Sequence, residues 1–173
     1  MIVSENEKNA LELVRKHMWM SMGAGLIPIP FVDWATVSGV QMKMLAALSD
    51  LYEIPFRKSI GKATIASLGG FILPHAMAFG WIGSMIKLIP GVGVLAGTPA
   101  MGLFAGAYTW ALGNVFIQHF ESGGTFLTFD AEKVRKYFQA QFEEGRKMAS
   151  ATEKDSVQKT PGFAGAGEAN PRA

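Results

Sequence analysis

Residues 63–86 read ATIASLGGFILPHAMAFGWIGSMI and residues 88–120 read LIPGVGVLAGTPAMGLFAGAYTWALGNVFIQHF; neither stretch contains an Asp, Glu, Lys or Arg. A helix of roughly 20 mostly apolar residues crosses a bilayer core about 30 Å thick. Each stretch is long enough for such a helix, and the prolines and glycines of residues 90–99 predict a turn between them. The sequence therefore predicts an antiparallel apolar helix hairpin, with its helices at 63–86 and 99–119.

Small residues recur at intervals of about one helical turn along both predicted helices. Such ridges allow a neighbouring helix to approach closely, in membranes and also in buried pairs of soluble helices. Because the ridges lie in adjacent segments, we expect them to pack the two hairpin helices against each other. The helix-packing residues predicted in this way are Ala76, Gly80 and Ser84 on the first helix and Gly102, Gly106 and Gly113 on the second.

Three further segments show the three- and four-residue spacing of apolar side chains that is typical of amphipathic helices. These segments are residues 5–22, 34–53 and 131–148. Residues 150–173 are small, polar and rich in Gly and Pro, so we expect a disordered tail there. The sequence thus predicts one all-α domain over residues 1–149, a helical membrane protein in which the hairpin packs with the amphipathic helices.

Prolines and glycines separate these segments. Each proline in residues 26–31 disfavours helix in the residue before it, and residues 88–93 break the apolar stretch in the same way. Irregular backbone is not tolerated in hydrocarbon unless protein surrounds it, so these apolar loops indicate buried or interfacial positions. Asp130 is suited to cap the last helix. The hinge residues predicted in the loops are Pro28, Pro30, Pro90, Gly91 and Gly93.

The sequence offers no arrangement suited to catalysis, metal binding or cofactor binding. Cysteine is absent, no phosphate-binding loop of the form G-x-x-x-x-G-K-[ST] is present, and the three histidines are isolated from one another. A net charge of +2 without a basic stripe interleaved with aromatics argues against nucleic acid. We expect no enzyme, no cofactor and no metal. His75 is the candidate intramembrane polar residue, and the simpler interpretation is a neutral histidine hydrogen-bonded across the helix pair.

Five segments combine in an order that is informative: GAGLIPIPFVD (23–33), QMKM (41–44), LY (51–52), LIPGVG (88–93) and AGAYTWALG (105–113). Together they resemble the YcjF-like family of bacterial proteins of unknown function, over about residues 10–120. The resemblance implies a mostly α-helical, membrane-associated module that is fused to, or encoded beside, Ras-like or dynamin-like GTPases. This chain has no GTPase domain, so the resemblance implies that a GTPase partner acts in trans.

These observations predict a non-enzymatic membrane adaptor or scaffold that recruits, or is regulated by, a small or dynamin-like GTPase. The expected partners are membrane lipid, that GTPase and a second copy of the chain, with no nucleic acid. Lys and Arg flank the hairpin at 57–62 and 133–136, which favours the bacterial inner membrane with both termini cytoplasmic. Two other classes stay open. One is a soluble helical domain that binds a protein or an apolar ligand, and the other is a small oligomeric channel or transporter component.

Overall fold

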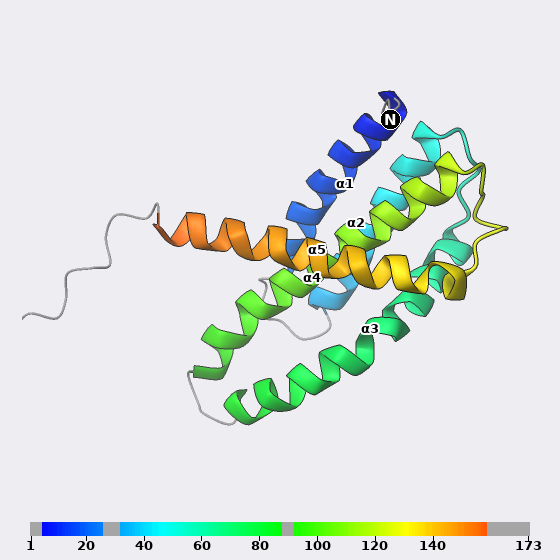
Figure 1. Cartoon of the computed structure of the whole chain (residues 1–173). Coiled ribbons are helices and arrows are strands. Elements are labelled where there is room, and N and C mark those ends of the chain that lie inside the picture. Colours follow the sequence, from blue (N-terminus) through cyan, green and yellow to red (C-terminus); the bar gives the residue numbers. More distant parts are fainter. Residues whose placement is uncertain (1–4, 26–31, 88–91, 159–173) are drawn as a thin grey trace, which may run out of the picture.

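The computed structural model describes residues 5–25, 32–87 and 92–158, and it places side chains in all of these except 32–35, 73–87, 92–100 and 152–158. Pro28, Pro30, Pro90 and Gly91 lie outside the described residues. The described chain consists of five α-helices (Figure 1): α1 (Glu5–Ala24), α2 (Val32–Leu51), α3 (Lys58–Lys87), α4 (Val92–Glu121) and α5 (Ala131–Gln158). The prediction of an all-α fold is confirmed.

The two hairpin helices are longer than predicted. α3 is continuous through Pro74, and α4 begins at Val92, seven residues before Pro99. The turn between the helices is therefore shorter than residues 90–99. Gly93, which we predicted to be a loop hinge, is instead the second residue of α4.

α5 also continues beyond its predicted end. It runs to Gln158, ten residues past the predicted boundary at 148, so the first part of the predicted disordered tail is helical. Residues 149–158 include Ala, Glu, Lys and Gln, which favour helix. The composition that suggested a tail, with its Gly and Pro, begins only at Pro161.

α4 lies at the centre of the bundle and contacts each of the other four helices. Every residue from Ala105 to Ile117 is buried, including the large side chains of Leu112 and Phe116. A helix that is apolar on all sides is surrounded either by protein or by lipid, and here other helices surround this half of α4. The prediction of a lipid-facing helix over 99–119 is therefore corrected for residues 105–117, which form the protein core.

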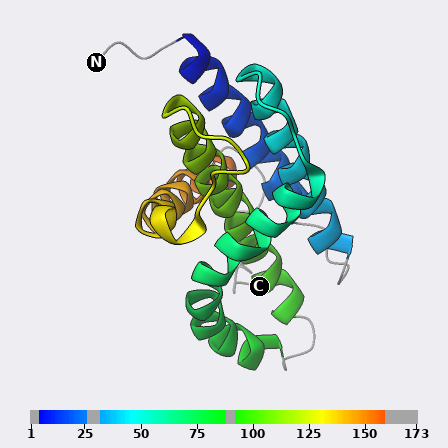
Figure 2. The same cartoon turned by 90° about the vertical axis from the view of Figure 1, so that its right-hand side faces the viewer.

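The remaining halves of α3 and α4 form the hairpin tip, which we define as residues 73–87 and 92–101. In both views the tip projects beyond the ends of α1 and α2, at the lower end of the molecule (Figures 1 and 2). Its base is held by the bundle, where Ile72 of α3 is 3% exposed. Within the part of the chain that the structure describes, no helix combines the length and the apolarity that crossing a bilayer requires.

Candidate functional site

The glycines predicted for helix packing on α4 face α1, which supplies the atoms nearest to them. A Cβ added to Gly25, which follows α1, would lie 3.0 Å from the Gly102 Cα. A Cβ on Gly106 would lie 2.3 Å from the Met22 side chain. Farther along, a Cβ on Gly113 would lie 2.4 Å from a Val14 methyl. The glycine ridge of α4 thus allows α1 to lie against it in an antiparallel direction.

The other predicted packing residues, Ala76, Gly80 and Ser84, lie in the tip half of α3, as does His75. The structure describes their backbone as helical and does not describe their side chains.

A buried polar network that we did not predict joins α1, α2 and α4. The Thr109 hydroxyl donates to the Ala105 carbonyl at 2.8 Å and lies 2.8 Å from the Ser21 hydroxyl. The Gln41 side-chain amide donates to the same Thr109 oxygen at 3.3 Å. All three side chains are buried, so the network fixes Ser21, Gln41 and Thr109 at one level along the bundle axis. The nearby Trp110 indole N–H is buried and has no hydrogen-bond partner among the described residues.

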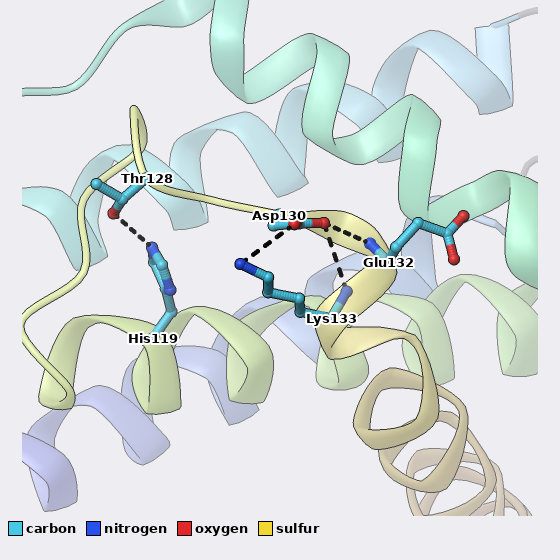
Figure 3. A network of polar contacts seen from close by, with 5 residues as sticks. All are labelled: His119, Thr128, Asp130, Glu132 and Lys133. Atoms are coloured by element: carbon cyan, nitrogen blue, oxygen red, sulfur yellow. Dashed lines mark hydrogen bonds and ion pairs between the residues drawn. The ribbon is translucent and has the colours of Figure 1, made fainter.

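The opposite end of the bundle is held by polar contacts at the end of α4. The Tyr52 hydroxyl of α2 donates to the Glu121 carboxylate at 2.8 Å. Burial, together with this hydrogen bond, raises the pKa of Tyr52 above its usual value. His119 Nε2 lies 2.9 Å from the Thr125 carbonyl and 3.5 Å from the Thr128 hydroxyl, and so fastens the following loop to α4 (Figure 3).

The same loop ends at the start of α5. The Asp130 carboxylate accepts hydrogen bonds from the backbone N–H groups of Glu132 and Lys133, at 3.1 and 3.4 Å (Figure 3). This is an N-cap, as the sequence predicts for Asp130. From there α5 crosses α4, with Phe138 against Tyr108 at 5.4 Å between ring centroids and Phe142 against Phe104 at the same distance.

Charge is distributed unequally along the bundle. Residues 17–42 contain one charged residue, Asp33, and residues 63–120 contain one, Lys87. These two runs include all the parts of α1 to α4 that lie toward the tip from the Ser21, Gln41 and Thr109 level, whereas residues 110–120 extend the other way, to the contact of Glu121 with Tyr52. The charged residues of α1 to α4 otherwise lie on the opposite side of this level, in residues 5–16, 43–62 and 121. Because α1 and α2 point their adjoining ends toward the tip, the sequence's separate uncharged runs converge on one end of the molecule (Figure 1). We call this the uncharged end.

Exposed apolar side chains lie beside the uncharged end. Trp19 is 37% exposed, Met20 43% and Met101 39%. Met101 is next to Gly102, which Gly25 contacts, so Met101 lies near the base of the tip, whereas Trp19 and Met20 lie on α1 just before Ser21. Leu127, 70% exposed, belongs to the loop at the opposite end and serves as a natural comparison.

The described residues contain no group of His, Asp and Glu side chains that could hold a metal ion. A groove between α1 and α2, about 480 Å³ in volume, is open to solvent and lined by Asn9, Glu12, Leu13, Lys16, His17 and Ala47. Among the residues that line this groove, no nucleophilic side chain is placed beside a base. The feature best suited to a function is therefore the uncharged end with its projecting tip, since exposed apolar surface marks interaction sites with proteins or membranes.

Sequence reasoning identified the uncharged runs and the glycine ridge on α4, but it missed the residues that bring these runs together. Ser21, Gln41 and Gly25 carry no distinctive spacing. One signal in the sequence could have indicated this convergence. Residues 17–32 and 63–86 both lack charged residues, and the first of these runs contains the proline loop between two helices.

The comparisons with known proteins involve most of the chain. A family model for a domain of unknown function, DUF697, matches residues 1–147. The chain is also similar to "Magnetosome membrane protein 22" of Magnetospirillum gryphiswaldense (strain DSM 6361 / JCM 21280 / NBRC 15271 / MSR-1), with 35% identity over 149 residues, which is 86% of this chain and 73% of that protein. No solved structure matches the chain.

Proposed function

Since this chain belongs to the DUF697 family of domains of unknown function, we propose that it is a membrane-associated, non-enzymatic adaptor whose uncharged end enters the bilayer. The observation that carries this proposal is the convergence of the uncharged runs on the end from which the hairpin tip projects. The printed name of its relative, a magnetosome membrane protein, supports a location at a membrane.

The length of the tip favours insertion into the bilayer without spanning it. Residues 73–87 of α3 extend about 22 Å and residues 92–101 of α4 about 15 Å at 1.5 Å per residue. Both lengths are below the thickness of about 30 Å of the hydrocarbon core. With its base fixed in the bundle, the tip reaches into the membrane and the charged end stays in water.

The charged end then provides the adaptor surface. Supported by the resemblance to the YcjF-like family, we propose that a small or dynamin-like GTPase acting in trans is the partner there, and that self-association on the bilayer increases the local density of that surface. The same resemblance supports a bacterial membrane as the location, and the Lys and Arg residues that flank the hairpin at 57–62 and 133–136 support the inner membrane with both termini cytoplasmic.

Membrane insertion is tested by flotation of the purified chain with phosphatidylcholine vesicles. Met101→Glu places a carboxylate on an exposed position at the base of the tip, where a charge is costly to insert. We expect the variant to bind at least tenfold more weakly than the unchanged protein. Leu127→Glu makes the same chemical change at the opposite end, so it should bind as the unchanged protein does.

Two results would contradict the proposal. If the unchanged chain does not float with vesicles, or is released from them by alkaline carbonate without detergent, insertion is wrong. The soluble binding domain is then the better account. If Met101→Glu and Leu127→Glu weaken binding equally, the uncharged end is not the contact surface.

A further inference from the structure

Three lysines lie close to the boundary of the uncharged end, each on a different helix. Lys16 is the last charged residue of α1, Lys43 the first to follow Asp33 on α2, and Lys62 the last on α3 before Lys87. All three side chains are exposed. We call Lys16, Lys43 and Lys62 the basic collar.

Contacts between their neighbours show that the collar lysines lie at similar heights along the bundle. Lys43 is two residues from Gln41, and Lys16 five residues from Ser21, the two side chains that meet at Thr109. Lys62 follows Gly61, whose Cβ would lie 3.4 Å from the Met42 side chain of α2. The three lysines therefore lie at similar heights, where the charged part of the bundle gives way to the uncharged end.

The collar lysines differ from three basic residues of α5. On α5, Lys133, Arg135 and Arg146 each pair with an acidic residue three positions earlier, at 3.6, 3.7 and 3.1 Å. None of the collar lysines forms an ion pair with a described residue. On α2 and α3 the nearest acidic residues in sequence, Asp50 and Glu53, are seven and nine positions away. The collar thus presents positive charge that the protein itself leaves uncompensated on these two helices.

We propose that the basic collar binds the phosphate groups of anionic lipids when the uncharged end enters a bilayer. This inference rests on the proposed function, because entry of the uncharged end, beyond the tip itself, is what carries the collar to the headgroups; Lys62 lies about 16 Å along α3 from the start of the tip at residue 73. Exposed lysines are suited to binding lipid phosphate, because the flexible apolar stem of each can lie along apolar surface while its ammonium group stays among the phosphate groups. Each lysine held near an anionic surface strengthens binding about fivefold at physiological ionic strength.

The test compares binding of the full chain to vesicles of pure phosphatidylcholine and to vesicles containing phosphatidylglycerol. We expect the unchanged protein to prefer the anionic vesicles by about two orders of magnitude, the product of three such contributions. Lys43→Gln/Lys62→Gln should weaken binding to anionic vesicles by roughly 25-fold and leave binding to neutral vesicles unchanged. Lys8→Gln is the matched control, because Lys8 is an exposed lysine of α1 about 12 Å farther from the tip than Lys16. It should change binding less than twofold.

The outcomes separate this inference from the proposed function. If the unchanged chain binds equally to both vesicle types, the collar does not bind anionic lipid, but the proposal of insertion stands. If it binds to neither vesicle type, both proposals are wrong. If Lys8→Gln weakens binding to anionic vesicles as much as Lys43→Gln or Lys62→Gln alone does, the attraction is diffuse and the collar proposal is wrong. Competition by inorganic phosphate at constant ionic strength shows a free-phosphate site and also overturns it. Far-ultraviolet circular dichroism of each variant confirms that these exposed substitutions leave the helices intact.

Discussion

At the scale of single residues, the glycines of α4 differ in what a side chain would meet. At Gly113 the space is filled by Val14, whose two methyl groups would lie 2.4 and 2.5 Å from an added Cβ. Val14 is β-branched and fully buried, so it has few other rotamers to adopt. Gly70 of α3, by contrast, has no atom within 4 Å of an added Cβ.

Gly113→Ala is expected to destabilise the fold. Overpacking at such a site costs about 1–3 kcal/mol, and the better helix propensity of alanine returns up to about 1 kcal/mol. We expect a net loss of about 1–2 kcal/mol in the free energy of unfolding, measured by urea denaturation. Gly70→Ala, an equally helical change in open space, should instead stabilise by about 0.5–1 kcal/mol. The close α1–α4 contact would be disproved by the same small gain at both positions.

The sequence predicted that Gly102, Gly106 and Gly113 are packing residues, but it assigned them to the wrong neighbour. A small-residue ridge indicates only that some helix approaches closely, and it carries no information on which one. The partner is set by side chains such as Met22 and Val14, which fill the ridge from α1. Their spacing is that of any amphipathic helix, so the sequence alone did not distinguish α1 from α3.

At the scale of the elements, the start of α5 depends on one capping residue. Asp130 accepts two backbone N–H hydrogen bonds, and its ion pair with Lys133, at 3.6 Å between largely exposed groups, adds little. Asp130→Ala should therefore destabilise the protein by about 1 kcal/mol through loss of the cap. Asp130→Ser retains a capping oxygen and removes the charge.

Thermal unfolding followed by circular dichroism distinguishes these effects. The serine variant should keep most of the stability and the alanine variant should not. Equal losses in the two variants would show that the charge of Asp130, rather than its hydrogen bonds, matters at this position.

Element types were predictable because apolar side chains recur with helical spacing over long segments. The sequence did not show whether α4 is surrounded by lipid or by protein. Residues 105–117 are apolar on every side, and this pattern is the same for a helix surrounded by lipid and for one surrounded by four other helices. Only the packed arrangement of Phe116, Leu112 and their neighbours identifies this segment as core.

At the scale of the whole molecule, the structure has a polar axis that runs from the charged end to the tip. If that axis lies along the bilayer normal, the tryptophans occupy different depths. Trp81 belongs to the tip, whereas Trp110 is in the core and 5% exposed. Two single-tryptophan variants, with the other tryptophans changed to Phe, report these depths separately.

We expect lipids brominated in the middle of their acyl chains to quench Trp81 strongly in vesicle-bound protein. Trp110, shielded by the surrounding helices, should be quenched little. Equal quenching of the two residues would mean that the bundle opens or lies flat on the membrane, and so would contradict the axial orientation.

The charged segments 5–16 and 43–62 can be seen in the sequence, but only the folded structure shows that they lie at the same end of the molecule. The chain reverses its direction along the bundle three times between α1 and α4. It thereby places segments that are far apart in sequence at the same height. The polar network at Thr109 is the contact that shows this alignment.

The central position of α4 also sets an order of events during synthesis. The ribosome completes α4 before it makes α5, the helix that supplies Phe138 and Phe142 to the α4 surface. While those residues are still being made, the nascent chain presents an uncovered strip of its most apolar helix. Domains form from the N-terminus as the chain emerges at about 5–20 residues per second, so this exposure lasts on the order of seconds. Translation speed through residues 122–142 therefore determines how long chaperones or a membrane have access to a surface that the finished protein conceals.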